Sequence, residues 1–122
     1  MEKIPLEISG VNVKRGLEIC DGSLDIYVDV LRSYVIDIQE ALEKMQNVSG
    51  ETLDAYSTTL HGVKGISQAI GAEEAGKTAL LLEEMADRGD LTGVLAKNSA
   101  FMKYAENLAN EIQVWLEKFD AA

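Results

Sequence analysis

Between Glu51 and Ala72, apolar residues recur at intervals of three and four positions. This spacing constrains the fold more than any other feature of the chain. At about 100° of rotation per residue, most of the large apolar residues, together with one serine, fall on one stripe of the width that a helix buries in a protein core. The stripe consists of Leu53, Tyr56, Leu60, Val63, Ser67 and Ile70. The pattern therefore predicts a helix with one buried face and one exposed flank.

The same spacing continues along the chain and predicts further helices over residues 13–20, 24–47, 73–88 and 91–119. Residues typical of helix N-caps and C-terminal ends flank these segments, namely Asn12, Ser23, Ser49 and Asp90 as caps and Gly71 and Gly89 as ends. Short connections between the last four helices imply antiparallel neighbours. We therefore expect an all-α fold: an antiparallel up-down-up-down four-helix bundle over residues 11–122, with a short extra N-terminal helix and an extended lead-in over residues 1–10.

The only histidine of the chain, His61, falls on the exposed flank of the helix that begins near Glu51. With Leu60 at zero, His61 lies near +100° and Gly65 near +140°. Gln68 lies near +80°, and Lys64 lies nearer the buried stripe at about +40°. The imidazole should therefore point away from the core, with a cation and a glycine one turn further along.

Two glycines, Gly62 and Gly65, lie inside this predicted helix, where each costs roughly 0.5–1 kcal/mol relative to alanine. One explanation is access, because a glycine one turn from His61 removes a side chain that would block a partner. In that case Lys64 would favour an anionic group on the ring. The alternative is a lone surface histidine beside glycines that serve close helix packing.

The helix predicted over residues 24–47 has more apolar residues than one stripe needs. Its expected core residues are Leu24, Tyr27, Val28, Leu31, Tyr34 or Val35, Ile38, Leu42 and Met45. Ile26, Val30 and Ile36 lie off that stripe. They indicate either a wide core face or an exposed apolar patch beside His61 that receives a partner. The last helix should contribute Phe101, Ala105, Leu108, Ile112, Trp115 and Phe119.

Composition excludes several classes of function. The formal net charge of −10 makes nucleic acid and anionic membranes poor partners. One histidine and one cysteine cannot supply a zinc site, and no Walker loop or kinase motif indicates ATP binding. The single Cys20 fits a reducing compartment, and no apolar run suggests a secretory signal or a membrane span. We therefore expect a cytoplasmic location.

The segment HGVKGISQAIGA, from His61 to Ala72, resembles the signature of histidine-containing phosphotransfer (HPt) domains, H-x-x-K-G-x-S-x-x-x-G-A. Every specified position matches. The flanking chain is also similar to this family, because residues 12–18 resemble its short first helix and residues 27–34 the start of its long second helix. The resemblance covers the chain from about Val11 to the C-terminus.

The resemblance implies a phosphocarrier in multistep two-component phosphorelays, without autokinase activity. By carry-over, His61 is the phosphorylated residue, on Nε2. Lys64 would stabilise the phosphorylated state, Gly65 would leave room for the partner, and Gln68 would hydrogen-bond the partner or the phosphoryl oxygens. In the family, receiver domains dock on the second helix and the next. The partners would be response-regulator receiver domains or a hybrid sensor histidine kinase, and the receiver would supply Mg²⁺, because this chain has no evident Mg²⁺ cluster.

Two functions remain open at this level. The first is the phosphorelay carrier, and the second is a non-catalytic helical-bundle module that binds receiver-like partners. His61 distinguishes them, because a module without phosphotransfer has no need of it. We expect a monomer, with a homodimer through the apolar patch as the alternative.

Overall fold

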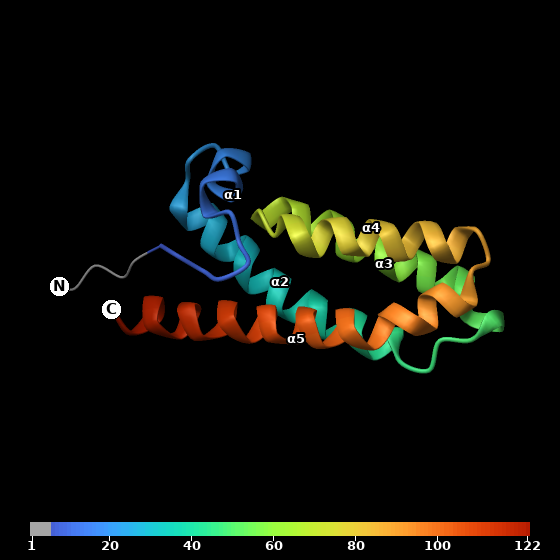
Figure 1. Ribbon diagram of the computed structural model, residues 1–122. Helices are drawn as coiled ribbons and strands as arrows, with labels where there is room; N and C mark the ends of the chain where they lie inside the picture. Colours follow the sequence, from blue (N-terminus) through green and yellow to red (C-terminus); the bar gives the residue numbers. More distant parts are fainter. Residues whose placement is uncertain (1–5) are drawn as a thin grey trace.

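Five α-helices and one 3₁₀ turn follow one another in residues 6–122, the part of the chain that the computed structural model describes (Figure 1). They are α1 (Val13–Ile19), α2 (Leu24–Met45), η1 (Gly50–Thr52), α3 (Leu53–Ile70), α4 (Glu73–Asp87) and α5 (Leu91–Ala121). The described residues contain no strand, so the predicted all-α class is confirmed for them. Half of the predicted lead-in, residues 1–5 with Pro5, lies outside the described residues. The other half is not helical, and its Ile8 is buried.

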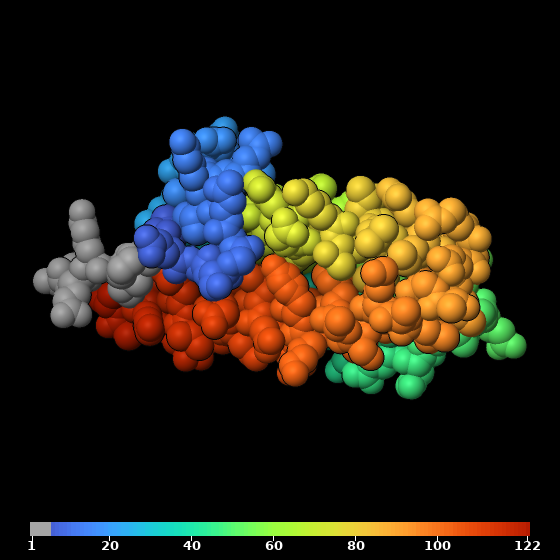
Figure 2. Space-filling view, viewed as in Figure 1, coloured from blue at the N-terminus to red at the C-terminus, as the bar shows by residue number. Residues whose placement is uncertain are grey.

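The four longer helices form a helical bundle in which each packs mainly against two of the others. α3 packs most extensively against α4 and also contacts α2, while α5 lies against α2 and α4. α1 packs against α3 and the start of α2, and in Figure 2 its blue surface adjoins the yellow surface where α3 passes into α4. The end of α3 is therefore fixed by a separate small helix.

The buried face of α3 matches the predicted stripe residue for residue, because Leu53, Tyr56, Leu60, Val63, Ser67 and Ile70 are all buried. The buried Ser67 also forms a polar contact, since its Oγ lies 3.0 Å from the buried hydroxyl of Tyr34 on α2. Tyr56 donates from its hydroxyl to Oδ1 of Asn98 on α5 at 2.8 Å. These bonds satisfy polar groups that burial would otherwise leave unpaired.

Most of the predicted helix ends are found near their expected positions. Asn12, Ser23 and Asp90 each accept a hydrogen bond from a backbone amide in the first turn of their helix. Gly71 and Gly89 have φ angles of 85° and 74°, the left-handed conformation that glycine adopts readily.

Three predicted helix boundaries differ from the structure by two residues, and one of them is the end of α5, which extends to Ala121 rather than Phe119. The predicted first turn at Glu51 belongs to the separate 3₁₀ turn η1, with Ser49 as its N-cap, so α3 begins only at Leu53. Thr52 Oγ1 accepts from the Ser49 amide at 2.8 Å, and this local bond tightens the chain before α3 begins. α2 ends at Met45 rather than Asn47, because Gln46 adopts an extended ψ of 148° and Asn47 a positive φ of 57°.

Some predicted core residues of α2 and α5 lie at the surface. Leu24 is 39% exposed because it lies in the first turn of α2, while the Phe119 side chain is only partly buried. Ile26 and Ile36 are 53% and 60% exposed, which rules out the wide core face for these two, whereas Val30 packs partly against the core. None of the helices described between residues 6 and 122 combines the length and hydropathy needed to cross a bilayer.

Candidate functional site

The close approach of α3 to α4 creates the surroundings of His61. The face of α4 toward the core consists of small residues apart from Leu82, and Gly76 lies so near α3 that a Cβ there would be 3.2 Å from Gln68 Cγ. Because small residues predominate on this face, the two helices lie close together along their length. A side chain on α4 can therefore reach the flank of α3 that carries His61.

The side chain that does so is Glu83. Its Oε2 lies 2.8 Å from Nδ1 of His61, and its Oε1 lies 3.3 Å from Nζ of Lys64. The Lys64 ammonium is also 3.4 Å from the same Nδ1. His61, Lys64 and Glu83 thus form one cluster, in which the His61 side chain is 67% exposed while those of Lys64 and Glu83 are 22% and 14% exposed.

The carboxylate of Glu83 decides which ring nitrogen of His61 is available. An ionised carboxylate accepts hydrogen bonds but cannot donate them, so a neutral imidazole bonded to it must carry its proton on Nδ1. A hydrogen bond from the Lys64 ammonium to Nδ1 would instead require an unprotonated Nδ1, because an ammonium can only donate. We assign the proton to Nδ1, because the bond to Glu83 is shorter by far. Nε2 then keeps its lone pair on an exposed ring.

Glu83 is itself held in place by Lys64. Its Oε1 is shielded from solvent and has no hydrogen-bond partner among the described residues. A carboxylate in that position is costly unless an opposite charge compensates it. The ammonium of Lys64 lies close enough to do so, although its geometry is not that of a hydrogen bond. Lys64 therefore supports the orientation of His61 through Glu83 as well as supplying positive charge.

The glycines beside His61 do not serve close packing. A Cβ at Gly62 or Gly65 would meet no atom within 4 Å, whereas one at Gly16, where α1 packs, would overlap the ring of Tyr27. The packing explanation for the two glycines is therefore wrong. Together with the exposed ring, they leave an unobstructed strip along the outer side of α3.

Replacing Gly65 with alanine should therefore stabilise the fold. Nothing in the structure opposes the added methyl group, and alanine favours the helix by ~1 kcal/mol relative to glycine. Urea unfolding followed by circular dichroism should show that rise in the free energy of unfolding. Gly16→Ala is the matched control and should destabilise, because its methyl group would overlap Tyr27 and the carbonyl oxygen of Ile70. Equal losses in both variants would show that Gly65 is needed for packing.

The structure places Gln68 less favourably than the sequence suggests. It is exposed on α3, but its side chain leans on α4 at Gly76, and no hydrogen bond joins it to His61 among the described residues. Glu83, in contrast, is absent from the site predicted from the sequence, although it makes the shortest contact to the ring.

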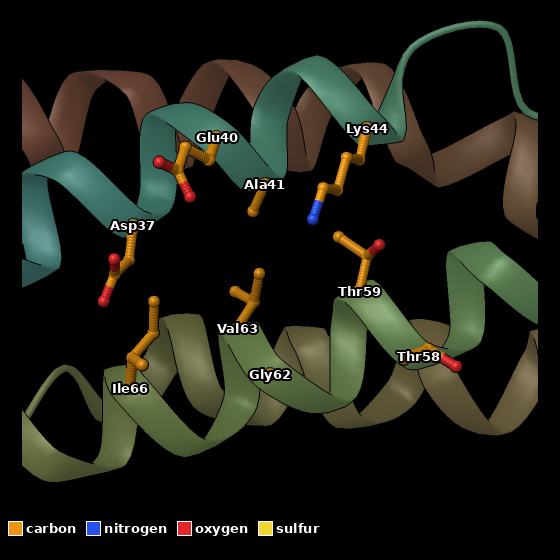
Figure 3. Close-up of a pocket in the computed structure, with 9 residues that line it drawn as sticks. All are labelled: Asp37, Glu40, Ala41, Lys44, Thr58, Thr59, Gly62, Val63 and Ile66. Carbon is orange, nitrogen blue, oxygen red and sulfur yellow. The ribbon is translucent and has the colours of Figure 1, made fainter.

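A groove adjoins this site on the other side of α3, between α3 and α2 (Figure 3). It has a volume of about 270 Å³, and Ala41 and Val63 approach each other at its centre. His61 does not line it, but the neighbouring Gly62 does. Gly62 therefore belongs both to this groove and to the strip beside His61.

Two further findings concern the site. In residues 6–122, no group of three or more His, Cys, Asp or Glu side chains is arranged to hold a metal ion. The chain was compared with protein-family models, with curated proteins and with solved structures, and none of the three comparisons gave a match.

The contact with Glu83 should determine the tautomer of the His61 ring. Glu83→Ala should shift the imidazole away from the Nδ1–H tautomer, because the acceptor that holds that proton is gone. Glu83→Gln is the matched control, since its amide oxygen still accepts from Nδ1. Nitrogen-15 NMR of the ring reports the tautomer directly. An unchanged tautomer in Glu83→Ala would show that this contact does not set the ring's protonation.

Proposed function

We propose that this chain is a histidine phosphotransfer protein, in which His61 accepts a phosphoryl group from a receiver-domain aspartate and passes it to another. The observation that carries the proposal is an exposed imidazole bonded through Nδ1 to Glu83, which leaves Nε2 as a nucleophile. The resemblance of residues 61–72 to the HPt signature supports it independently. We also infer that α2 to α5 form an antiparallel up-down-up-down bundle with α1 as the extra helix, as their order and contacts suggest.

In the proposed first step, the lone pair on His61 Nε2 attacks the phosphorus atom of an aspartyl phosphate. A P–N bond forms while the P–O bond to the aspartate breaks, and the aspartate leaves as a carboxylate. The ring gains positive charge, which its Nδ1–H shares with the Glu83 carboxylate. In the second step, the carboxylate of another receiver attacks the same phosphorus, and the P–N bond breaks to return the neutral ring.

The remaining residues would act by charge and by access. The Lys64 ammonium lies 3.4 Å from Nδ1 of the ring, and its positive charge would favour a phosphoryl anion on the same imidazole. Gly65 leaves space over the outer side of α3, where a receiver must approach within bonding distance. Gln68 would contribute a hydrogen bond only if its side chain left Gly76. As the family resemblance implies, the receiver would bring Mg²⁺ to the transferred group.

The proposed function implies particular partners, a cellular location and an oligomeric state. We propose that its partners are response-regulator receiver domains or a hybrid sensor histidine kinase in the cytoplasm, and that the chain acts as a monomer. It would neither bind ATP nor phosphorylate itself. The negative charge of the chain makes nucleic acid an unfavourable partner.

A phosphate-transfer assay with purified proteins tests the proposal. Receiver domains phosphorylated with acetyl phosphate and Mg²⁺ are mixed with the chain, and phosphoramidate serves as a small donor that needs no docking. We expect an acid-labile, alkali-stable label on the chain, which a second receiver then removes. A chain that binds receivers but takes up phosphate from neither donor would be an interaction module, and the proposal would be wrong.

A further inference from the structure

The groove between α2 and α3 is bordered by charges that no other described residue neutralises. Asp37 and Glu40 stand on α2 at the end of the groove where Ile66 lies, and Lys44 stands at the other end, opposite Thr59 (Figure 3). Within residues 6–122, none of these three charged side chains takes part in an ion pair. The groove thus has an acidic end and a basic end, both available to another molecule.

The shape of the groove suits a side chain rather than a small-molecule ligand. Its volume of about 270 Å³ lies just below the ~300–1,000 Å³ of pockets that enclose such ligands. Its centre is formed by Ala41 and Val63, which offer an apolar surface. A lysine or arginine combines an aliphatic stem, which packs on such a surface, with a charged head that stays near water.

The distribution of charges along the groove indicates which charged group of a partner binds at each end. Two carboxylates lie at the acidic end, in a chain whose net charge of −10 already attracts basic surfaces. Complementary charges of this kind fix the orientation of a partner and raise the rate of association. The basic end, at Lys44, favours an acidic group, so the groove accepts a partner in one direction only.

We propose that the docking partner inserts a lysine or arginine side chain into the acidic end of this groove, with Asp37 and Glu40 as the residues that determine its specificity. This inference rests on the proposed function, because the partner in question is the receiver that delivers phosphate to His61. Gly62 lines the groove and is adjacent to His61, so one partner surface covers both. Receivers without a basic residue at that place are poor donors.

The test uses two double variants that change the net charge equally. Asp37→Lys with Glu40→Lys reverses the acidic end of the groove, whereas Glu106→Lys with Glu111→Lys places the same charges on exposed positions of α5. Phosphate transfer is measured from the receiver that is the fastest donor to the wild type, at low salt and limiting protein concentration. Each transfer rate is divided by the rate of labelling with phosphoramidate, which reports His61 itself.

We expect the groove variant to lose about tenfold in transfer rate and the α5 variant to lose about twofold at most. Added sodium chloride should slow transfer to the wild type more than transfer to the groove variant. Salt screens the attraction between the two carboxylates and the basic side chain of the receiver, and the variant no longer has this attraction. Equal rates in the two double variants would overturn the cationic anchor and leave the proposed function intact. Failure of the wild type to accept phosphate from either donor would instead overturn the proposed function. A wild-type dimer that the groove variant alone abolishes would show that a second copy occupies the groove.

Discussion

His61→Gln should abolish phosphate uptake completely, from phosphorylated receivers and from phosphoramidate alike. The lone pair of an amide nitrogen is delocalised into its carbonyl group, so glutamine offers no nucleophile in place of imidazole Nε2. The fold should survive, because the replaced side chain is mostly exposed and the glutamine amide can still donate to Glu83. Circular dichroism and urea unfolding check that second expectation.

The assay for this variant has little ambiguity, because the chain contains no other histidine. An acid-labile, alkali-stable label on the wild type therefore points to His61, and the same label on His61→Gln would contradict the assignment. Lys64→Gln is the informative control. It removes a positive charge near the ring but keeps the nucleophile, so uptake from phosphoramidate should slow by about tenfold rather than vanish. Equal loss in both variants would point to a role of Lys64 beyond charge.

The exposed position of His61 and the buried face of α3 could be predicted because both follow from the geometry of a single helix. Residue identity and a fixed rotation per residue decide which side of α3 meets the core. The exposure of the His61 ring confirms that part of the prediction. The same reasoning is weaker at helix ends, where local bonds such as that between Ser49 and Thr52 compete with the helix.

Glu83 could not be found in this way, because its contact to His61 depends on how two helices face each other. A signal was nevertheless present in the sequence. In a helical hairpin that turns at Ala72, residues equally distant from the turn lie opposite one another, and His61 and Glu83 are such a pair. The contact between Ser57 and Asp87 follows the same rule. Applying the rule requires knowing that α3 and α4 are antiparallel neighbours, and the α2–α3 groove depends likewise on helix packing.

Gly71→Ala should cause the largest loss of stability among these variants, because two costs coincide at this residue. Its φ of 85° costs a residue with a Cβ ~1–2 kcal/mol. The added Cβ would also fall 2.1 Å from the carbonyl oxygen of Asn12, directly before α1. Backbone atoms cannot yield as a flexible side chain does, so we expect a further ~1–3 kcal/mol from overpacking. The free energy of unfolding in urea should thus fall by about 3 kcal/mol or more.

Gly89→Ala is the control that separates the cost of the left-handed backbone conformation from the cost of the steric overlap. Gly89 has a similar φ of 74°, but a Cβ there would meet nothing within 4 Å. It should lose only the ~1–2 kcal/mol that the backbone conformation costs. Equal losses in the two variants would mean that α1 moves aside from Gly71 without penalty. Folded Gly71→Ala should still take up phosphate from phosphoramidate, because Gly71 caps the C-terminal end of α3, ten residues beyond His61. That result would separate the residues of the HPt-like signature into those that perform phosphate transfer and those that hold the helices together.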